Sequence, residues 1–157
     1  MNQPFDYIEM KIPAKPEYVG VIRLTLSGIA SRIGFSYEEL DDLKIAVSEA
    51  CTNAVQHAYQ NDAHGEVIVG FGLYEDRIEI MVADNGDSFD FEQARKGLGP
   101  YDQHDSVEFL REGGLGLYLI ETLMDEVRIH HKVGVTVFMT KYLEGERVEI
   151  DAETIST

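Results

Sequence analysis

Glu49 and Asn53 place a carboxylate and a carboxamide four residues apart, in a segment rich in alanine. Residues at this spacing are neighbours on one face of a helix. Asparagine is costly inside a helix, because its amide competes with the backbone for hydrogen bonds. Together the two groups could hold a divalent cation or orient a hydroxyl group. Taken alone, the pair indicates a solvated polar face more often than a site.

A second candidate is Asp84-Asn85-Gly86, which follows an apolar alternation beginning at Ile78. A carboxylate at the end of a strand could accept a hydrogen bond from an exocyclic amine, and Gly86 would let a flat ring lie close to the backbone. The alternative is an ordinary turn at a strand end, for which these residue types are common.

The run Gly113-Gly114-Leu115-Gly116 opens a predicted helix. Free backbone N–H groups and the helix dipole favour an anion there, and the glycines would let a phosphate approach. A dinucleotide-binding motif is excluded, since no clear buried strand precedes the run and the third glycine of that pattern is missing. A P-loop is also excluded, because Gly-Lys-Ser/Thr occurs nowhere in the sequence. The final predicted hairpin, with Thr136, signals little by itself.

The other reactive residues give weaker signals. Cys51 stands within a predicted helix among small residues, which favours a packed thiol over a nucleophile. His57, His64 and His104 match no zinc-binding spacing, so we predict no structural metal site.

Hydrophobic periodicity predicts the elements that must position these residues. In chain order they are strand 5–12, helix 18–33, helix 36–59 opened by a capping box of Ser36 and Glu39, strands 67–73 and 78–82 with a turn at 75–77, a helix from 113, and strands 127–129 and 135–139 with a turn at 132–134. This order predicts the α+β class: a two-layer α/β sandwich with an antiparallel or mixed, mostly antiparallel, sheet and helices on one face. We interpret residues 1–157 as a single domain, with a long irregular loop at 87–112 and an acidic tail at 143–157.

Composition limits the possible partners. The chain has 157 residues, with 13 Lys or Arg against 29 Asp or Glu, and a formal net charge of −16. This charge argues against binding to nucleic acid, whose phosphates would be repelled. No apolar run is long enough to span a membrane, and no signal peptide is visible at the N-terminus. The single cysteine fits a reducing cytoplasm, so we expect a cytoplasmic protein without membrane association.

In their order along the chain, these motifs form a specific pattern. Glu-x-x-x-Asn on a helix, Asp-x-Gly after a strand, a long loop, Gly-Gly-x-Gly-Leu opening a helix and a Gly-x-Thr hairpin resemble the GHKL, or Bergerat-fold, ATP-binding superfamily. The resemblance covers residues 8–142. Within the superfamily, the segments 48–54 and 113–120 most resemble the small bacterial anti-sigma serine-protein kinases.

The resemblance implies ATP and Mg²⁺ as cofactors and a role for each motif. Glu49 matches the general base, Asn53 the ligand of Mg²⁺, and Asp84 the carboxylate that binds the adenine amine. The remaining residues match the nucleotide-binding positions of the family, with 87–112 as the ATP lid: Gly86 beside the ring, Gly114, Leu115 and Gly116 at the phosphates, Thr136 at the adenine pocket, and Arg111 near the terminal phosphate. Many relatives have Asp-x-Gly-x-Gly, whereas Ser88 replaces the second glycine here.

The resemblance also implies two activities and their partners. One is sequestration of a stress sigma factor of the sigma-B type, and the other is phosphorylation of a serine on a STAS-domain anti-anti-sigma protein of the RsbV type. It implies a homodimer as well. The alternative is a non-catalytic, ATP-responsive module that only sequesters the sigma factor. Glu49 discriminates between the two, because binding alone does not need a general base.

Overall fold

The structure is a computed structural model that describes residues 6–61, 64–84, 116–132 and 134–143. Its elements, in chain order, are β1 (Asp6–Pro13), η1 (Pro16–Tyr18), α1 (Val19–Ile33), α2 (Tyr37–Asn61), β2 (Glu66–Leu73), β3 (Arg77–Ala83), α5 (Gly116–Leu123), β4 (Glu126–Lys132) and β5 (Gly134–Tyr142). The predicted order of helices and strands is therefore confirmed, with one short 3-10 helix added. Within these residues, no helix is long and apolar enough to cross a membrane.

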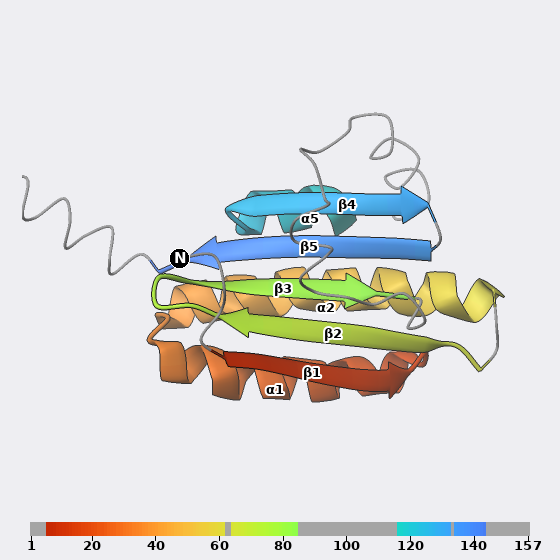
Figure 1. The fold of residues 1–157 in the computed structure, drawn as a ribbon, viewed down its shortest axis with the longest axis horizontal. Helices are drawn as coiled ribbons and strands as arrows, with labels where there is room; N and C mark the ends of the chain where they lie inside the picture. Colours follow the sequence, from red (N-terminus) through yellow and green to blue (C-terminus); the bar gives the residue numbers. More distant parts are fainter. Residues whose placement is uncertain (1–5, 62–63, 85–115, 133, 144–157) are drawn as a thin grey trace, which may run out of the picture.

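The five strands form one sheet in the order β1-β2-β3-β5-β4. Every neighbouring pair in this sheet is antiparallel, so the fully antiparallel alternative is the correct one. The helices α1, α2 and α5 all cover the same face of the sheet, and α2 lies between the other two (Figure 1). This arrangement confirms the predicted two-layer α+β sandwich. It also places the Glu49–Asn53 segment at the centre of the helical layer.

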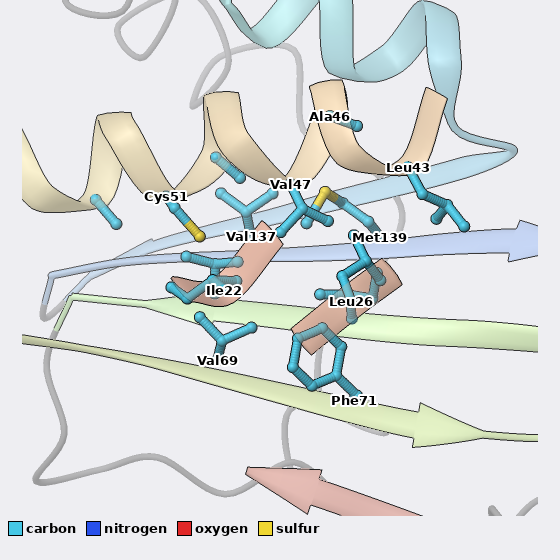
Figure 2. Packing of buried hydrophobic residues seen from close by; sticks show 14 of the residues in the cluster. Ile22, Leu26, Leu43, Ala46, Val47, Cys51, Val69, Phe71, Val137 and Met139 are labelled. Atoms are coloured by element: carbon cyan, nitrogen blue, oxygen red, sulfur yellow. The ribbon is translucent and has the colours of Figure 1, made fainter. Parts of the chain in front are cut away.

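The core lies between the helical layer and the sheet. Figure 2 shows Leu26 of α1, Val47 of α2, and Phe71 and Met139 of the sheet gathered in this layer. Their side chains are at most 1% exposed. Alternation along β2 and β5 turns every second residue toward the helices, which gives α2 a continuous apolar floor. Burial of each such side chain stabilises the fold by about 1.5–3 kcal/mol. This burial holds α2 packed against the sheet.

The start of α2 is set by two local devices that the sequence predicts. The backbone N–H of Ser36 donates to Glu39 Oε1 at 2.9 Å, and the N–H of Glu39 donates to Ser36 Oγ at 3.2 Å. This reciprocal pair is a capping box. Just before it, Gly34 ends α1 with a φ of 108°, a left-handed conformation that favours glycine. Because these contacts set where α2 begins, they also set which face Glu49 occupies.

Several predicted boundaries differ from the observed ones by one to three residues. Arg77 is the first residue of β3 rather than part of the turn, and Lys132 and Gly134 belong to β4 and β5. The hairpins are therefore tighter than the apolar alternation suggests. Tyr18 ends η1 and is 37% exposed, because Pro16 begins a separate 3-10 turn ahead of α1.

Cys51 is the buried thiol that the sequence predicts, and its chemistry can be tested. The side chain is fully buried, and desolvation raises the pKa of the thiol from 9.0 to about 12. Only the thiolate reacts, so alkylation of the native protein at pH 8 is expected to be roughly 10³-fold slower than that of an unperturbed cysteine. Mass spectrometry after iodoacetamide treatment would measure this, with the protein unfolded in urea as the control. Fast labelling of the native chain would contradict it.

Candidate active site

The Glu49–Asn53 pair faces α5 and not open solvent. Both side chains are half-buried. A Cβ built on Gly116, in the first turn of α5, would lie 3.1 Å from Glu49 Oε2 and 3.2 Å from Asn53 Nδ2. These distances are tighter than ordinary van der Waals contact, so glycine is the residue that lets α5 come this close. The simpler interpretation of the pair, a solvated polar face, is therefore wrong.

Asn53 carries a polar atom whose hydrogen-bonding capacity is unused. Its Nδ2 is buried and has no hydrogen-bond partner among the described residues. An unpaired buried donor costs about 1–3 kcal/mol, so such groups are usually satisfied by something. Rotation of the amide about its terminal bond exchanges oxygen and nitrogen, which would turn an acceptor toward a cation or a donor toward a phosphate. The geometry is thus suited to a charged ligand between α2 and α5.

Asp84 is held at the end of β3 by the neighbouring strand. Its N–H donates to the carbonyl of Val135 at 3.2 Å, and its Oδ1 accepts from the N–H of Val135 at 2.8 Å. The side chain is only 2% exposed. Thr136 lies opposite Ala83 in the β3–β5 register, one residue away from each of these partners. Because side chains alternate along a strand, Thr136 shares the face of Ala83, whereas the Asp84 side chain faces α2, so the structure does not bring these two side chains together.

His57 is a site residue that the sequence analysis missed. Its Nδ1 contacts Asp84 Oδ2, and its side chain is 27% exposed. In the sequence, His57 stands out only as a histidine that matches no zinc-binding spacing. The usable signal is its position four residues after Asn53, which extends the series that begins at Glu49 by one more turn of the same helix face. This face of α2 thus reaches from Glu49, beside α5, to Asp84, at the end of β3.

Two separate groupings make up the described site. Glu49, Asn53 and Gly116 meet between α2 and α5, and His57 and Asp84 meet between α2 and β3. Four further predicted site residues lie outside the described residues: Gly86, Arg111, Gly114 and Leu115. The predicted lid 87–112 and the tail from 144 also lie outside them. Their roles stay predictions.

Comparisons with known proteins agree with this arrangement. Residues 12–141 match the family model for the histidine kinase-like ATPase domain. The chain is 67% identical over 151 residues to the serine-protein kinase RsbW of Bacillus subtilis strain 168, covering 96% of this chain and 94% of that protein. It is 61% identical over 153 residues to the serine-protein kinase RsbW of Oceanobacillus iheyensis, covering 98% and 97%.

A solved structure shares the fold. The crystal structure of the RsbU and RsbW domains of a Mycobacterium tuberculosis protein superposes with a TM-score of 0.62 at 23% identity, covering 88% of this chain and 32% of that chain. The family match covers most of the chain, and relatives above 60% identity are aligned along almost their whole length. The chain therefore belongs to the histidine kinase-like ATPase family and, within it, to the RsbW serine-protein kinases.

Proposed function

We propose that this serine-protein kinase transfers the γ-phosphoryl group of Mg-ATP to a serine of a STAS-domain anti-anti-sigma protein of the RsbV type. We further propose that it sequesters a sigma factor of the sigma-B type. The observation that carries the catalytic part is the position of Glu49. Its carboxylate lies half-buried against the first turn of α5, next to the unpaired amide of Asn53. A solvated surface pair would have neither property.

Glu49 is the proposed general base. Phosphoryl transfer needs little covalent chemistry from the protein, so catalysis rests on positioning and on charge stabilisation. A carboxylate that accepts a hydrogen bond from the serine hydroxyl orients the attacking oxygen and takes its proton as the bond to phosphorus forms. Its partly buried place beside Gly116 holds this carboxylate near the start of α5, where N–H groups at a helix N-terminus favour phosphate.

Asn53 is the residue that we propose would hold Mg²⁺. Its amide fits this role, because the buried Nδ2 has no hydrogen-bond partner among the described residues and rotation of the amide would present the oxygen, a suitable ligand for a hard cation. When bound with ATP, Mg²⁺ would neutralise charge on the phosphates. Gly116 leaves room for these groups, because a Cβ there would lie only 3.1 Å from Glu49 Oε2 and 3.2 Å from Asn53 Nδ2 and would push against both side chains.

Asp84 is the proposed acceptor for the adenine amine, whereas the role of Thr136 stays a prediction. The buried carboxylate stands at the end of β3, and the hydrogen bond from Val135 fixes one of its oxygens. A carboxylate offers about four lone-pair positions, so acceptor capacity remains for a ligand.

The proposed partners also fit the charge of the chain. A net charge of −16 suits association with the basic surfaces by which sigma factors engage polymerase and promoter DNA, and it would make that association fast at low salt. The non-catalytic alternative is disfavoured, since the chain belongs to a family of serine-protein kinases and Glu49 offers the carboxylate that a general base requires. We also propose that the protein is cytoplasmic and forms a homodimer.

The direct test is incubation of the protein with labelled ATP, Mg²⁺ and a STAS-domain partner, followed by phosphosite mapping. We expect label on one serine of the partner, dependent on Mg²⁺, and a sigma factor that binds the kinase when the partner is phosphorylated. Absence of transfer to any STAS-domain partner, with sigma-factor binding retained, would support the non-catalytic alternative.

Asp84→Asn is expected to weaken ATP binding by about 1.5–3 kcal/mol, or roughly 10- to 150-fold. The amide would turn a donor toward either the adenine amine or His57, and the charge-assisted hydrogen bond would be lost. Isothermal titration calorimetry on the folded variant measures the change. Asp41→Asn, which removes the same charge at an exposed position of α2, is the matched control and should bind ATP normally. Unchanged affinity in Asp84→Asn would remove Asp84 from the adenine site.

A further inference from the structure

We propose that His57 is a positioning residue for nucleotide selection. It holds the Asp84 carboxylate in the orientation that accepts a hydrogen bond from the 6-amino group of a purine, and so favours adenine over a 6-oxo purine. This inference rests on the proposed role of Asp84 in binding adenine. It concerns a residue that does not itself need to touch the base.

Two elements hold the Asp84 carboxylate, one on each oxygen. The N–H of Val135, at the start of β5, donates to Oδ1 at 2.8 Å, and Nδ1 of His57, on α2, contacts Oδ2. A single contact would leave the carboxylate free to rotate about its Cβ–Cγ bond. Contacts on both oxygens, from the sheet and from the helical layer, fix the plane of the group. The direction of its unused lone pairs is then fixed as well.

The chemistry of the contact sets the direction of the hydrogen bond. An ionised carboxylate can only accept, so the proposal assigns the proton to Nδ1 of His57. One lone pair then remains on each Asp84 oxygen for a ligand. A 6-amino purine presents a donor to these lone pairs. A 6-oxo purine presents an acceptor, which leaves two unpaired acceptors facing each other.

The difference in exposure between the two side chains gives His57 a second effect. The Asp84 side chain is 2% exposed, whereas the His57 side chain is 27% exposed. The imidazole contacts Oδ2 and is itself partly exposed, so we infer that it limits the access of water to that oxygen. Water is the main competitor for the acceptor positions, since it can donate to a carboxylate in any orientation. Removal of the ring is expected to relax both the orientation of Asp84 and its preference for a 6-amino group.

Calorimetry of Mg-ATP and Mg-ITP binding to the full-length wild type and to three variants tests the proposal. ITP differs from ATP in carrying a 6-oxo group in place of the 6-amino group. For His57→Ala we expect the ATP affinity to fall about tenfold while the ITP affinity changes less than about twofold, so that the ratio of the two affinities falls about fivefold or more. For His57→Asn we expect recovery to within about threefold, because Asn Nδ2 can donate from nearly the place of His Nδ1. Gln56→Ala, at an exposed neighbouring position, is the control and should match the wild type.

A second measurement does not depend on any variant folding. Two-dimensional ¹⁵N–¹H NMR of the histidine rings in the nucleotide-free wild-type protein should show a proton on Nδ1 of His57. An unprotonated Nδ1 would overturn the proposal. Equal losses of ATP and ITP affinity in His57→Ala would also overturn it, because they indicate a merely structural role. Tighter ATP binding in that variant would show that the imidazole competes with the base.

Asp84→Asn separates this inference from the function on which it rests. If that variant binds ATP normally, the adenine role of Asp84 fails and the proposed function needs revision. If it loses ATP affinity while His57→Ala binds both nucleotides like the wild type, only the positioning role of His57 fails.

Discussion

Glu49→Gln is expected to lower the rate of partner phosphorylation by about 10²–10⁴-fold, the range typical of a positioned general base. Glutamine keeps the length of the side chain and its contact with the first turn of α5, but it cannot take the proton of the serine hydroxyl. Single-turnover transfer of labelled phosphate, at saturating Mg-ATP and partner, isolates this step. ATP affinity should change little, since the metal is assigned to Asn53. Sigma-factor binding should survive, because it needs a surface and not a base.

The matched control for this variant is Glu121→Gln. Glu121 lies on α5 and is exposed, so the substitution removes the same charge without reaching the site. It should phosphorylate the partner at the wild-type rate. If Glu49→Gln also reaches that rate, the base assignment is wrong, and the half-buried place of Glu49 must serve packing or metal binding.

Sequence patterns predicted the features of this fold that depend on residues close together in the chain. The capping box at Ser36 and Glu39 sets the start of α2, and the four-residue spacing then puts Glu49 and Asn53 on one face. Alternation identified the strands, because one face of each strand packs against the helical layer. The predicted element order was correct for the same reason.

Contacts between distant segments could not be predicted from the same patterns. The β4–β5 hairpin joins the sheet with β5 next to β3, so Val135 becomes the partner of Asp84. Because both strands of this hairpin are similarly apolar, β4 could equally have paired with β3 in place of β5. The apolar alternation does not distinguish these two arrangements. The approach of Gly116 to the Glu49–Asn53 pair follows from the same strand order, since α5 leads into β4.

The contact of His57 with Asp84 was missed for a related reason. The two residues are 27 positions apart and meet only because α2 packs across the end of β3. The spacing of His57 from Asn53 was visible in the sequence. Its meaning was not, because a polar residue on a helix face says nothing of the strand end that the helix covers.

Asn53→Ala is expected to keep or raise the stability of the protein while it lowers the kinase activity. The substitution removes a buried donor that has no partner among the described residues and replaces a weak helix former with the best one. Without nucleotide, the free energy of unfolding should therefore stay the same or rise by about 1 kcal/mol, as urea denaturation would measure. Most substitutions at half-buried positions lower it. A gain here would indicate that the wild-type amide is kept for a ligand and not for the fold.

Activity should change the other way in the same variant. Loss of the proposed metal ligand removes several kcal/mol of charge stabilisation, so phosphorylation should fall by about 10²–10³-fold. The stabilisation of the wild type by Mg-ATP, about 2.7 kcal/mol at a concentration 100 times Kd, should be largely absent. Gln56→Ala, at an exposed position on the same helix, controls for the loss of an amide and should keep both properties. If Asn53→Ala instead binds Mg-ATP normally and phosphorylates the partner, the metal belongs elsewhere, and Glu49 would be the next candidate because it lies on the same side of Gly116.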